Sequence, residues 1–165
     1  MASKYVISAA HCFFDDTDGD NVPDTEKKAE DIAIRIGDHN LDSVGEETLT
    51  PKTINVAKLT NHPDYNKAKI EDGNDIAVLE LAEEVDLNVY TPACMAKTTD
   101  STTFDGKTAT VAGWGLTSSG GSFPSPLSLR RVDVPVISEA DCKYKQPSII
   151  CAGFTEGGKD ACQVW

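Results

Sequence analysis

The sequence predicts an all-β fold, and three observations lead to that prediction. Several short runs place a hydrophobic residue at every second position, as strands with one buried face do. Glycine, proline, asparagine and aspartate separate these runs, and helical periodicity is scarce. Short strands at such intervals are typical of an antiparallel barrel or sandwich.

Two strands are predicted in the first half of the chain. Residues 32–36 carry isoleucine at every second position, and Gly37-Asp38 ends the run. Residues 75–81 are apolar on both faces until Glu80, as in a strand that is buried on both sides.

Two more strands are predicted in the second half. Residues 108–112 form one of them and lead into a Gly-Trp-Gly turn. Residues 130–136 form the other and carry valine at alternate positions. Pro135 suits an edge strand or a bulge, because proline has no N–H to donate to the sheet.

A helix start is expected only at residues 138–144, where Ser138 can cap the first turn and Asp141 stands three residues later. Residues 98–103 and 117–126 are rich in serine and threonine and are expected to form exposed loops. The first of these loops is also a candidate link between two halves.

The chain is strongly acidic, since its 165 residues include 15 Lys and Arg against 27 Asp and Glu, a net charge of −12. This charge argues against nucleic acid or an anionic membrane as a partner, because both are densely negative. No run approaches the roughly 20 apolar residues of a membrane-spanning helix. The apolar run at residues 5–10 is shorter than the roughly 7–15 residues of an export signal, so no signal peptide is expected.

The five cysteines leave two interpretations open. An odd number means that at least one has no partner within the chain, and no pair has the C-x-x-C spacing of a zinc site. The chain has either scattered buried thiols or a disulfide framework that lacks some partners. The five are Cys12, Cys94, Cys142, Cys151 and Cys162.

His11 and Asp75 have the most suggestive surroundings for chemistry. His11 stands in a Ser-Ala-Ala-His-Cys run, where small neighbours let the backbone pack closely beside an imidazole. Asp75 enters an apolar strand, where a charge is costly unless it is paired, and a histidine is a natural partner. A histidine taken singly is more often structural than catalytic, and this holds for His39 and His62 as well.

Four motifs stand in order along the chain: Ser8 to Cys12, Asn74 to Leu81, Ala112 to Gly115 and Cys151 to Gln163. Together they resemble the trypsin/chymotrypsin family of serine endopeptidases, at family-like separations and across essentially the whole chain. The resemblance implies an antiparallel double β-barrel of the trypsin type, truncated at both ends. Residues 1–95 are then a first barrel without its opening strands, and residues 96–165 an incomplete second barrel.

The resemblance implies roles for three residues. His11 resembles the general base that takes a proton from a serine and returns it to the leaving amine. Asp75 resembles the carboxylate that holds the imidazole tautomer. Asp160 resembles the carboxylate at the base of a specificity pocket, although a solvated acid in a glycine-rich loop is the alternative. The implied partners are protein or peptide substrates with Arg or Lys at the cleavage site.

The chain departs from the family where the nucleophile is expected. After Cys162-Gln163 the family continues with Gly-Asp-Ser-Gly-Gly, whereas this chain reads Val164-Trp165 and stops. Ser119-Gly120-Gly121 echoes that motif, but it lacks the preceding Gly-Asp and is expected to be a loop. Without the serine and the oxyanion donors, we expect the chain as given to be inactive.

The resemblance also gives each cysteine an expected state. Cys142 and Cys151 pair with each other, and Cys12 and Cys162 lack their usual partners. Cys94 resembles the cysteine that ties the domain to an upstream propeptide or regulatory segment. The full-length product is expected to be secreted, because disulfides need an oxidising compartment.

No cofactor is expected, and structural calcium is the alternative. The loop from Asp16 to Asp24 resembles the start of a calcium loop, but Asn21 and Lys27 stand where an EF-hand has glycine and glutamate. A second acidic group lies where many trypsins hold calcium, without the ligand spacing: Asp38, Asn40, Glu46 and Glu47.

Three functions follow from these observations. The leading hypothesis is a trypsin-like serine endopeptidase domain that cuts after Arg or Lys. The alternative is a non-catalytic protease homologue that acts as a binding or regulatory protein. A calcium-binding module built on the acidic loop is the third.

Overall fold

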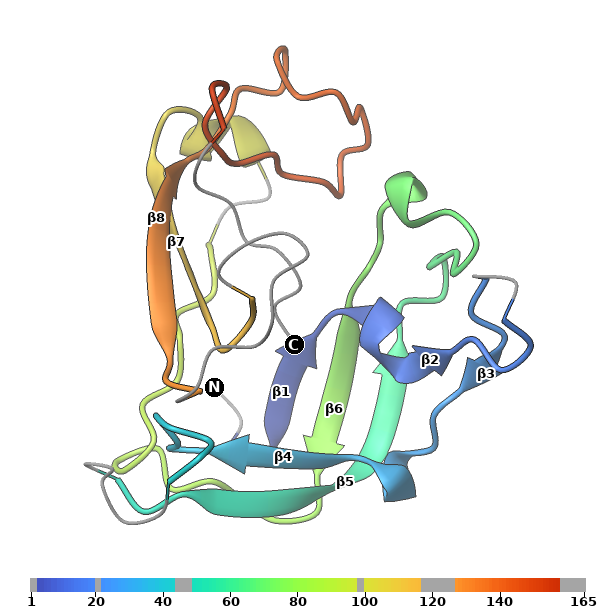
Figure 1. The fold of residues 1–165 in the computed structure, drawn as a ribbon, viewed down its shortest axis with the longest axis vertical. Helices are drawn as coiled ribbons and strands as arrows, with labels where there is room; N and C mark the ends of the chain where they lie inside the picture. Colours follow the sequence, from blue (N-terminus) through green and yellow to red (C-terminus); the bar gives the residue numbers. More distant parts are fainter. Residues whose placement is uncertain (1–2, 20–21, 44–48, 98–99, 117–126, 158–165) are drawn as a thin grey trace. The chain divides into compact units, whose positions relative to one another are not determined.

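The computed structural model describes residues 3–19, 22–43, 49–97, 100–116 and 127–157 (Figure 1). The predicted all-β class is confirmed, since the described residues form strands and short 3₁₀ helices without an α-helix. None of the described helices is long and apolar enough to cross a membrane. The chain forms two compact units, Met1–Gly37 with Pro51–Cys94, and Asp38–Thr50 with Met95–Trp165.

The first unit contains a four-stranded antiparallel sheet in the order β1-β6-β5-β4. Its strands are β1 (Tyr5–Ser8), β4 (Ala33–Ile36), β5 (Lys52–Asn61) and β6 (Ala77–Leu81). A small hairpin of β2 (Phe14–Asp15) and β3 (Thr25–Glu26) belongs to the same unit. Three 3₁₀ helices complete it: η1 (Ala10–Phe13), η2 (Ala29–Asp31) and η3 (Ile70–Asp72).

The long strand β5 curls the sheet. Its first residues pair with β4 and its second half pairs with β6. The register shifts between Val56 and Lys58, which is where the strand passes from one neighbour to the other. A bulge of this kind bends a strand and strengthens its twist, and Figure 1 shows β5 turning between its two partners.

The core of the first unit lies on the concave face of this sheet. Ile54, Leu79 and Leu81 are its largest fully buried side chains. They alternate with exposed neighbours, since Val78 is 40% exposed. The prediction that residues 75–81 are buried on both sides is therefore wrong, because the sheet is antiparallel and packs through one face.

The second unit contains a two-stranded antiparallel sheet of β7 (Thr108–Gly113) and β8 (Arg130–Pro135). Pro135 ends β8, where its missing N–H disturbs no neighbouring strand. A 3₁₀ helix, η4 (Ser101–Phe104), precedes β7, and Asp100 caps it by accepting the N–H of Thr102 at 3.0 Å. The predicted loop 117–126 lies outside the described residues.

The helix start predicted at residues 138–144 is wrong, because the chain forms a single turn there. The cap itself does form: Ser138 Oγ accepts the N–H of Asp141 at 3.3 Å and donates to its carboxylate at 2.7 Å. The next residue, Cys142, is tied to Cys151 by a disulfide with a Cα–Cα distance of 5.6 Å. A chain held to a segment nine positions further on follows the disulfide loop and does not continue as a helix.

Candidate active site

His11 and Asp75 meet because two paired strands bring their flanking residues to the same end of the sheet. Ser8 at the end of β1 lies opposite Ala77 at the start of β6. In an antiparallel pair, the residues that follow one strand and those that precede the other emerge side by side. His11 follows β1 within η1, and Asp75 stands just before β6.

A left-handed turn directs the chain into β6 and places Asp75. Gly73 has a φ of 80° and Asn74 a φ of 59°. Glycine and asparagine adopt such values more readily than other residues do. Gly73 is buried, whereas Asp75 is half-buried. The Gly-Asn-Asp sequence is therefore the local reason why this carboxylate points at η1.

Both carboxylate oxygens of Asp75 bind His11. Oδ2 lies 2.6 Å from Nδ1 of the imidazole, and Oδ1 accepts the backbone N–H of His11 at 2.8 Å. The side chain of His11 is 37% exposed and that of Asp75 is 22% exposed. When Nδ1–H donates to Asp75, the lone pair of the neutral ring lies on Nε2, where it can accept a proton.

Two neighbouring groups respond to the charge of Asp75. Burial raises the pKa of the Cys12 thiol, and the negative charge of Asp75 raises it further. Burial also raises the pKa of the Tyr65 hydroxyl, and Asp75 and Cys12 add to that effect. Both groups therefore lie close enough to Asp75 for its charge to act on them.

Tyr65 is a site neighbour that sequence reasoning missed. Its ring packs against the hydrophobic core, and its backbone N–H donates to the carbonyl of His62 at 3.0 Å. It stands in a polar loop between β5 and β6, where no periodic pattern marks a residue as buried. The only available signal was an aromatic side chain in an otherwise polar segment.

The other two histidines serve local structure. The carbonyl oxygen of His39 accepts the indole N–H of Trp114 at 3.1 Å. The ring nitrogen Nδ1 of His62 accepts the backbone N–H of Asp64, also at 3.1 Å. Among the described residues, neither imidazole binds a carboxylate as His11 binds Asp75.

The remaining predicted site residues lie outside the described residues. Asp160 is among them, so the structure does not place it relative to any other group. The same holds for Cys162 and for Ser119-Gly120-Gly121. Of the three predicted site residues, the structure thus brings together His11 and Asp75.

The predicted disulfide between Cys142 and Cys151 is confirmed. Cys12 and Cys94 form no disulfide with any described residue. Cys12 is half-buried beside the site, whereas Cys94 is exposed.

The acidic loops do not gather metal ligands in the part of the chain that the structure describes, where no three His, Cys, Asp or Glu side chains converge. The carboxylate of Asp16 accepts the N–H of Gly19 at 2.7 Å. That of Asp24 accepts hydroxyl hydrogen bonds from Thr17 and Thr25, which lower its pKa. Structural calcium stays a prediction, and three of its expected ligands lie outside the described residues: Asp20, Glu46 and Glu47.

In the Ser-His-Asp triad of hydrolases, a carboxylate orients the imidazole of the histidine base through Nδ1, and Asp75 contacts His11 at the same nitrogen. Comparison with known proteins identifies the family of the chain. The family model described as Trypsin matches residues 1–164, and the chain belongs to the trypsin family of serine proteases.

Three relatives illustrate the similarity. The chain is 35% identical to serine protease 1 of Rattus norvegicus, over 97% of this chain and 58% of the relative. It is 34% identical to trypsin of Sus scrofa, over 98% of this chain and 62% of the relative. It is 33% identical to trypsin-3 of Salmo salar, over 99% of this chain and 61% of the relative. The chain thus spans about six tenths of the length of these relatives.

Proposed function

We propose that this chain is part of the catalytic domain of a trypsin-like serine endopeptidase, in which His11 is the general base and Asp75 orients it. The observation that carries the proposal is the pair of contacts between Asp75 and His11. Oδ2 lies 2.6 Å from the ring nitrogen Nδ1, and Oδ1 lies 2.8 Å from the backbone nitrogen. These contacts fix both the tautomer and the direction of the ring, as proton transfer at Nε2 requires.

In this function, Nε2 of His11 takes a proton from a serine hydroxyl while the serine oxygen attacks the peptide carbonyl. The same nitrogen then gives the proton to the leaving amine, and Asp75 stabilises the imidazolium in between. No Gly-Asp-Ser-Gly-Gly motif occurs among the 165 residues. We therefore propose that these residues alone do not hydrolyse peptides, and that the complete protein supplies the nucleophile and the oxyanion donors.

Cleavage after Arg or Lys is the proposed specificity. Asp160 follows Gly157-Gly158-Lys159, in the motif that resembles the wall of a trypsin-like pocket. A buried carboxylate would pair with a guanidinium or an ammonium group of the substrate. The net charge of −12 supports the same choice, because it favours the approach of basic peptides.

Secretion and a link to an upstream segment complete the proposal. The Cys142–Cys151 disulfide needs an oxidising compartment to persist. Cys94 is exposed and forms no disulfide with the described residues, so it is available for a bond to a propeptide or regulatory segment.

The test uses the complete protein, read from its transcript through both ends of this reading frame. It is assayed on peptides that differ only in having Arg, Lys, Phe or Ala before the cleaved bond. We expect cleavage after Arg and Lys, which His11→Ala abolishes and the matched change His39→Ala leaves intact. Loss of cleavage after Arg and Lys in Asp160→Ala would support the pocket. Peptide binding without hydrolysis would instead favour a non-catalytic homologue.

A further inference from the structure

The hairpin of β2 and β3 begins at the residue that follows η1, the short helix that carries His11. The N–H of Phe14, the first residue of β2, donates to the carbonyl of His11. The N–H of Lys27, the residue after β3, donates to the carbonyl of Phe13 at 2.8 Å. Backbone hydrogen bonds at the start and the end of the hairpin therefore meet the carboxyl end of η1.

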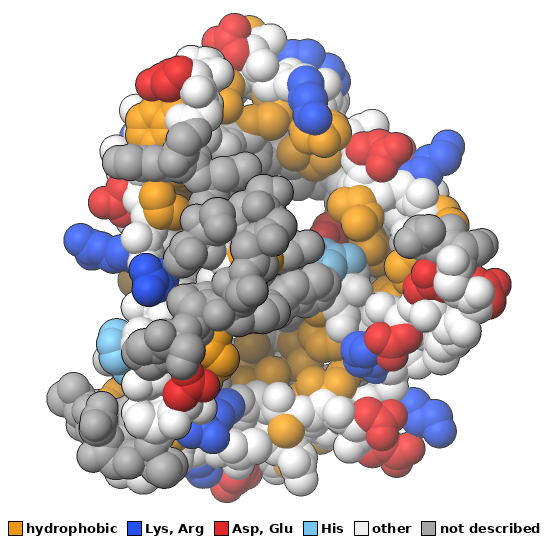
Figure 2. Space-filling view, viewed as in Figure 1, with side chains coloured by type: hydrophobic (Ala, Val, Ile, Leu, Met, Phe, Trp, Pro, Cys, Tyr) orange, Lys and Arg blue, Asp and Glu red, His pale blue; other side chains and the backbone are white. Residues whose placement is uncertain are grey.

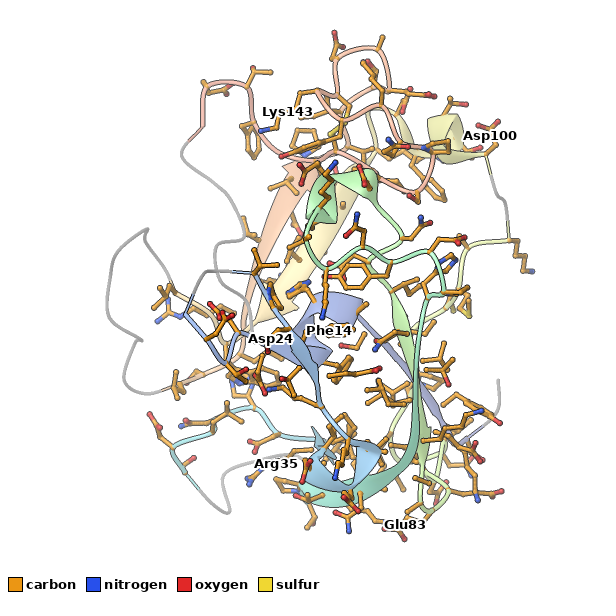
Figure 3. All side chains as sticks on the ribbon, turned by 90° about the vertical axis from the view of Figure 1, so that its right-hand side faces the viewer. Phe14, Asp24, Arg35, Glu83, Asp100 and Lys143 are labelled. Atoms are coloured by element: carbon orange, nitrogen blue, oxygen red, sulfur yellow. A yellow bond between two sulfur atoms is a disulfide. The ribbon has the colours of Figure 1, made fainter. Side chains whose placement is uncertain are left out.

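The side chain of Phe14 is held by two groups from the loop that follows β5. Its ring centroid lies 5.7 Å from that of Tyr65. On the same ring, Lys67 Nζ lies 5.6 Å from the centroid and also donates to the carbonyl of Asp24 at 2.7 Å. Lys67 thus links Phe14, the first residue of β2, to Asp24, the residue before β3. Figure 3 shows Phe14 and Asp24 close together on this side of the molecule.

A third contact fastens the far strand of the hairpin. The amide of Asn61, the last residue of β5, donates to the carboxylate of Glu26 at 2.6 Å. At the right of Figure 2, a few acidic side chains lie among uncharged surface atoms. Asn61 at the end of β5 and Lys67 in the loop that follows thus each donate a hydrogen bond to the hairpin.

Tyr65 connects these contacts on Phe14 to the site. Its ring contacts Phe14 and packs against the core. Cys12, the residue after His11, packs against the same core. Its hydroxyl oxygen is buried and has no hydrogen-bond partner among the described residues. A buried hydroxyl without a partner costs free energy, so the ring, and not the hydroxyl, is the part that stabilises the arrangement.

The short helix η1 needs such support for a physical reason. It is a single 3₁₀ turn of four residues, and so short a helix has little stability of its own. More than a third of the His11 side chain is exposed, so packing on the ring itself is incomplete. Asp75 holds the ring at one atom and the backbone at another, and the carboxyl end of η1 is held by the buried side chain of Phe13 and by the hairpin.

We propose that the β2–β3 hairpin is a positioning element for His11, and that Phe14, clamped between Tyr65 and Lys67, is its key residue. The hairpin keeps η1 in the place where the imidazole meets Asp75. The proposal rests on the proposed function, in which His11 is the base, but the geometry that it describes can be measured without catalysis.

The test follows the imidazole N–H of His11 by NMR in the 165-residue chain labelled with ¹⁵N-histidine. We expect one protected N–H among the three histidines, and its loss in Asp75→Asn assigns it to His11. Phe14→Ala is expected to raise its exchange rate at least about tenfold, whereas Phe14→Tyr keeps the ring and the protection. Lys67→Met should give an intermediate rate, and Lys69→Met, on the same loop, should give the wild-type rate.

In the complete protein, Phe14→Ala should lower kcat by on the order of 10²-fold with KM unchanged, as a displaced base does. Methyl resonances of Leu79 report whether each variant folds. If Phe14→Ala does not fold, Phe14→Leu and Lys67→Met decide the question in the same way. The proposal is overturned if the imidazole N–H of His11 exchanges at the wild-type rate in folded Phe14→Ala. It is likewise overturned if that rate is unchanged in both Phe14→Leu and Lys67→Met. Activity that survives His11→Ala would instead overturn the proposed function.

Discussion

Asp75 is the residue on which the account of the site depends, because each of its oxygens has a separate task. Oδ2 faces the ring nitrogen that must carry the proton, and Oδ1 holds the backbone of the same histidine. An amide in place of the carboxylate keeps the shape but offers one acceptor and one donor. The ring would then be free to adopt the other tautomer, in which Nε2 carries the proton and cannot act as a base.

We therefore expect Asp75→Asn to lower kcat of the complete protein by about 10⁴-fold, the loss that this change causes in the triad of the family. The matched control is Asp64→Asn, an exposed carboxyl group on the preceding loop. Steady-state kinetics on an Arg peptide measures both. Equal, small losses in the two variants would show that Asp75 does not orient the base.

Cys12 provides a chemical reporter of the charge on Asp75. Because burial and Asp75 both raise the pKa of the Cys12 thiol, the thiolate fraction at pH 8 is smaller than that of an ordinary thiol and grows as the pH rises. Iodoacetamide should thus modify exposed Cys94 before Cys12, and the rate at Cys12 should increase steeply with pH.

The substitution Asp75→Asn removes one of the two causes of that shift. It should lower the pKa of Cys12 and speed its alkylation at pH 8, whereas Asp64→Asn should not. Peptide mapping by mass spectrometry measures both cysteines in one sample. Faster alkylation of Cys12 than of Cys94 in the unaltered chain would contradict the placement of this thiol.

At the scale of elements, β6 joins the site to the core. Asp75 precedes the strand, and Leu79 within it is completely buried between β1 and β5. Loss of packing around Leu79 should therefore loosen both the sheet and the turn that carries Asp75.

Leu79→Ala should lower the free energy of unfolding by about 2–5 kcal/mol, because it removes buried methyl groups and leaves a cavity. Val78→Ala is the matched control, since its side chain points to the opposite face and is 40% exposed. We expect that change to stay within about 0.5 kcal/mol. Urea denaturation measures both, and equal losses would contradict the one-sided burial of β6.

The strands that the sequence predicts are short alternating or apolar runs that turn residues bound. β4, β6, β7 and β8 fall within a residue or two of the expected ranges. β5 was missed because Ile54 and Val56 keep the alternation only until the bulge, after which Leu59 faces the core in place of Lys58. β1 is not predicted, because its run of four residues is too short to show a periodic pattern.

The residues of the site also fall into those that the sequence predicts and those that it does not. His11 and Asp75 were predictable because motif and strand placement both mark them, and the two strands that bring them together are neighbours in the sheet. Tyr65, Lys67 and Asn61 were not predictable, because their contacts with the β2–β3 hairpin link segments far apart in the sequence that share no periodic pattern. Contacts between irregular segments depend on how the whole chain folds, which local patterns do not encode.

At the scale of the whole molecule, the two compact units do not follow the chain in simple order. Asp38–Thr50 belongs to the second unit although it lies between β4 and β5 of the first. The backbone explains this, since Leu41 N–H donates to Leu127 at 3.0 Å and Leu129 N–H donates to His39 at 2.7 Å. The division into two barrels at residues 1–95 and 96–165 stays a prediction.

The whole molecule is also where the proposed activity must be tested, because this chain covers about six tenths of its relatives. The most direct measurement is to treat the complete protein with an arginine chloromethyl ketone and to map the modified residue. Such a reagent places an electrophile beside the histidine that acts as the base of an Arg-specific protease. We predict alkylation of His11 with loss of peptide hydrolysis, no reaction at His39 or His62, and protection by an Arg peptide. Alkylation of another histidine, or full hydrolysis after His11 is alkylated, would contradict the assignment of His11 as the catalytic base.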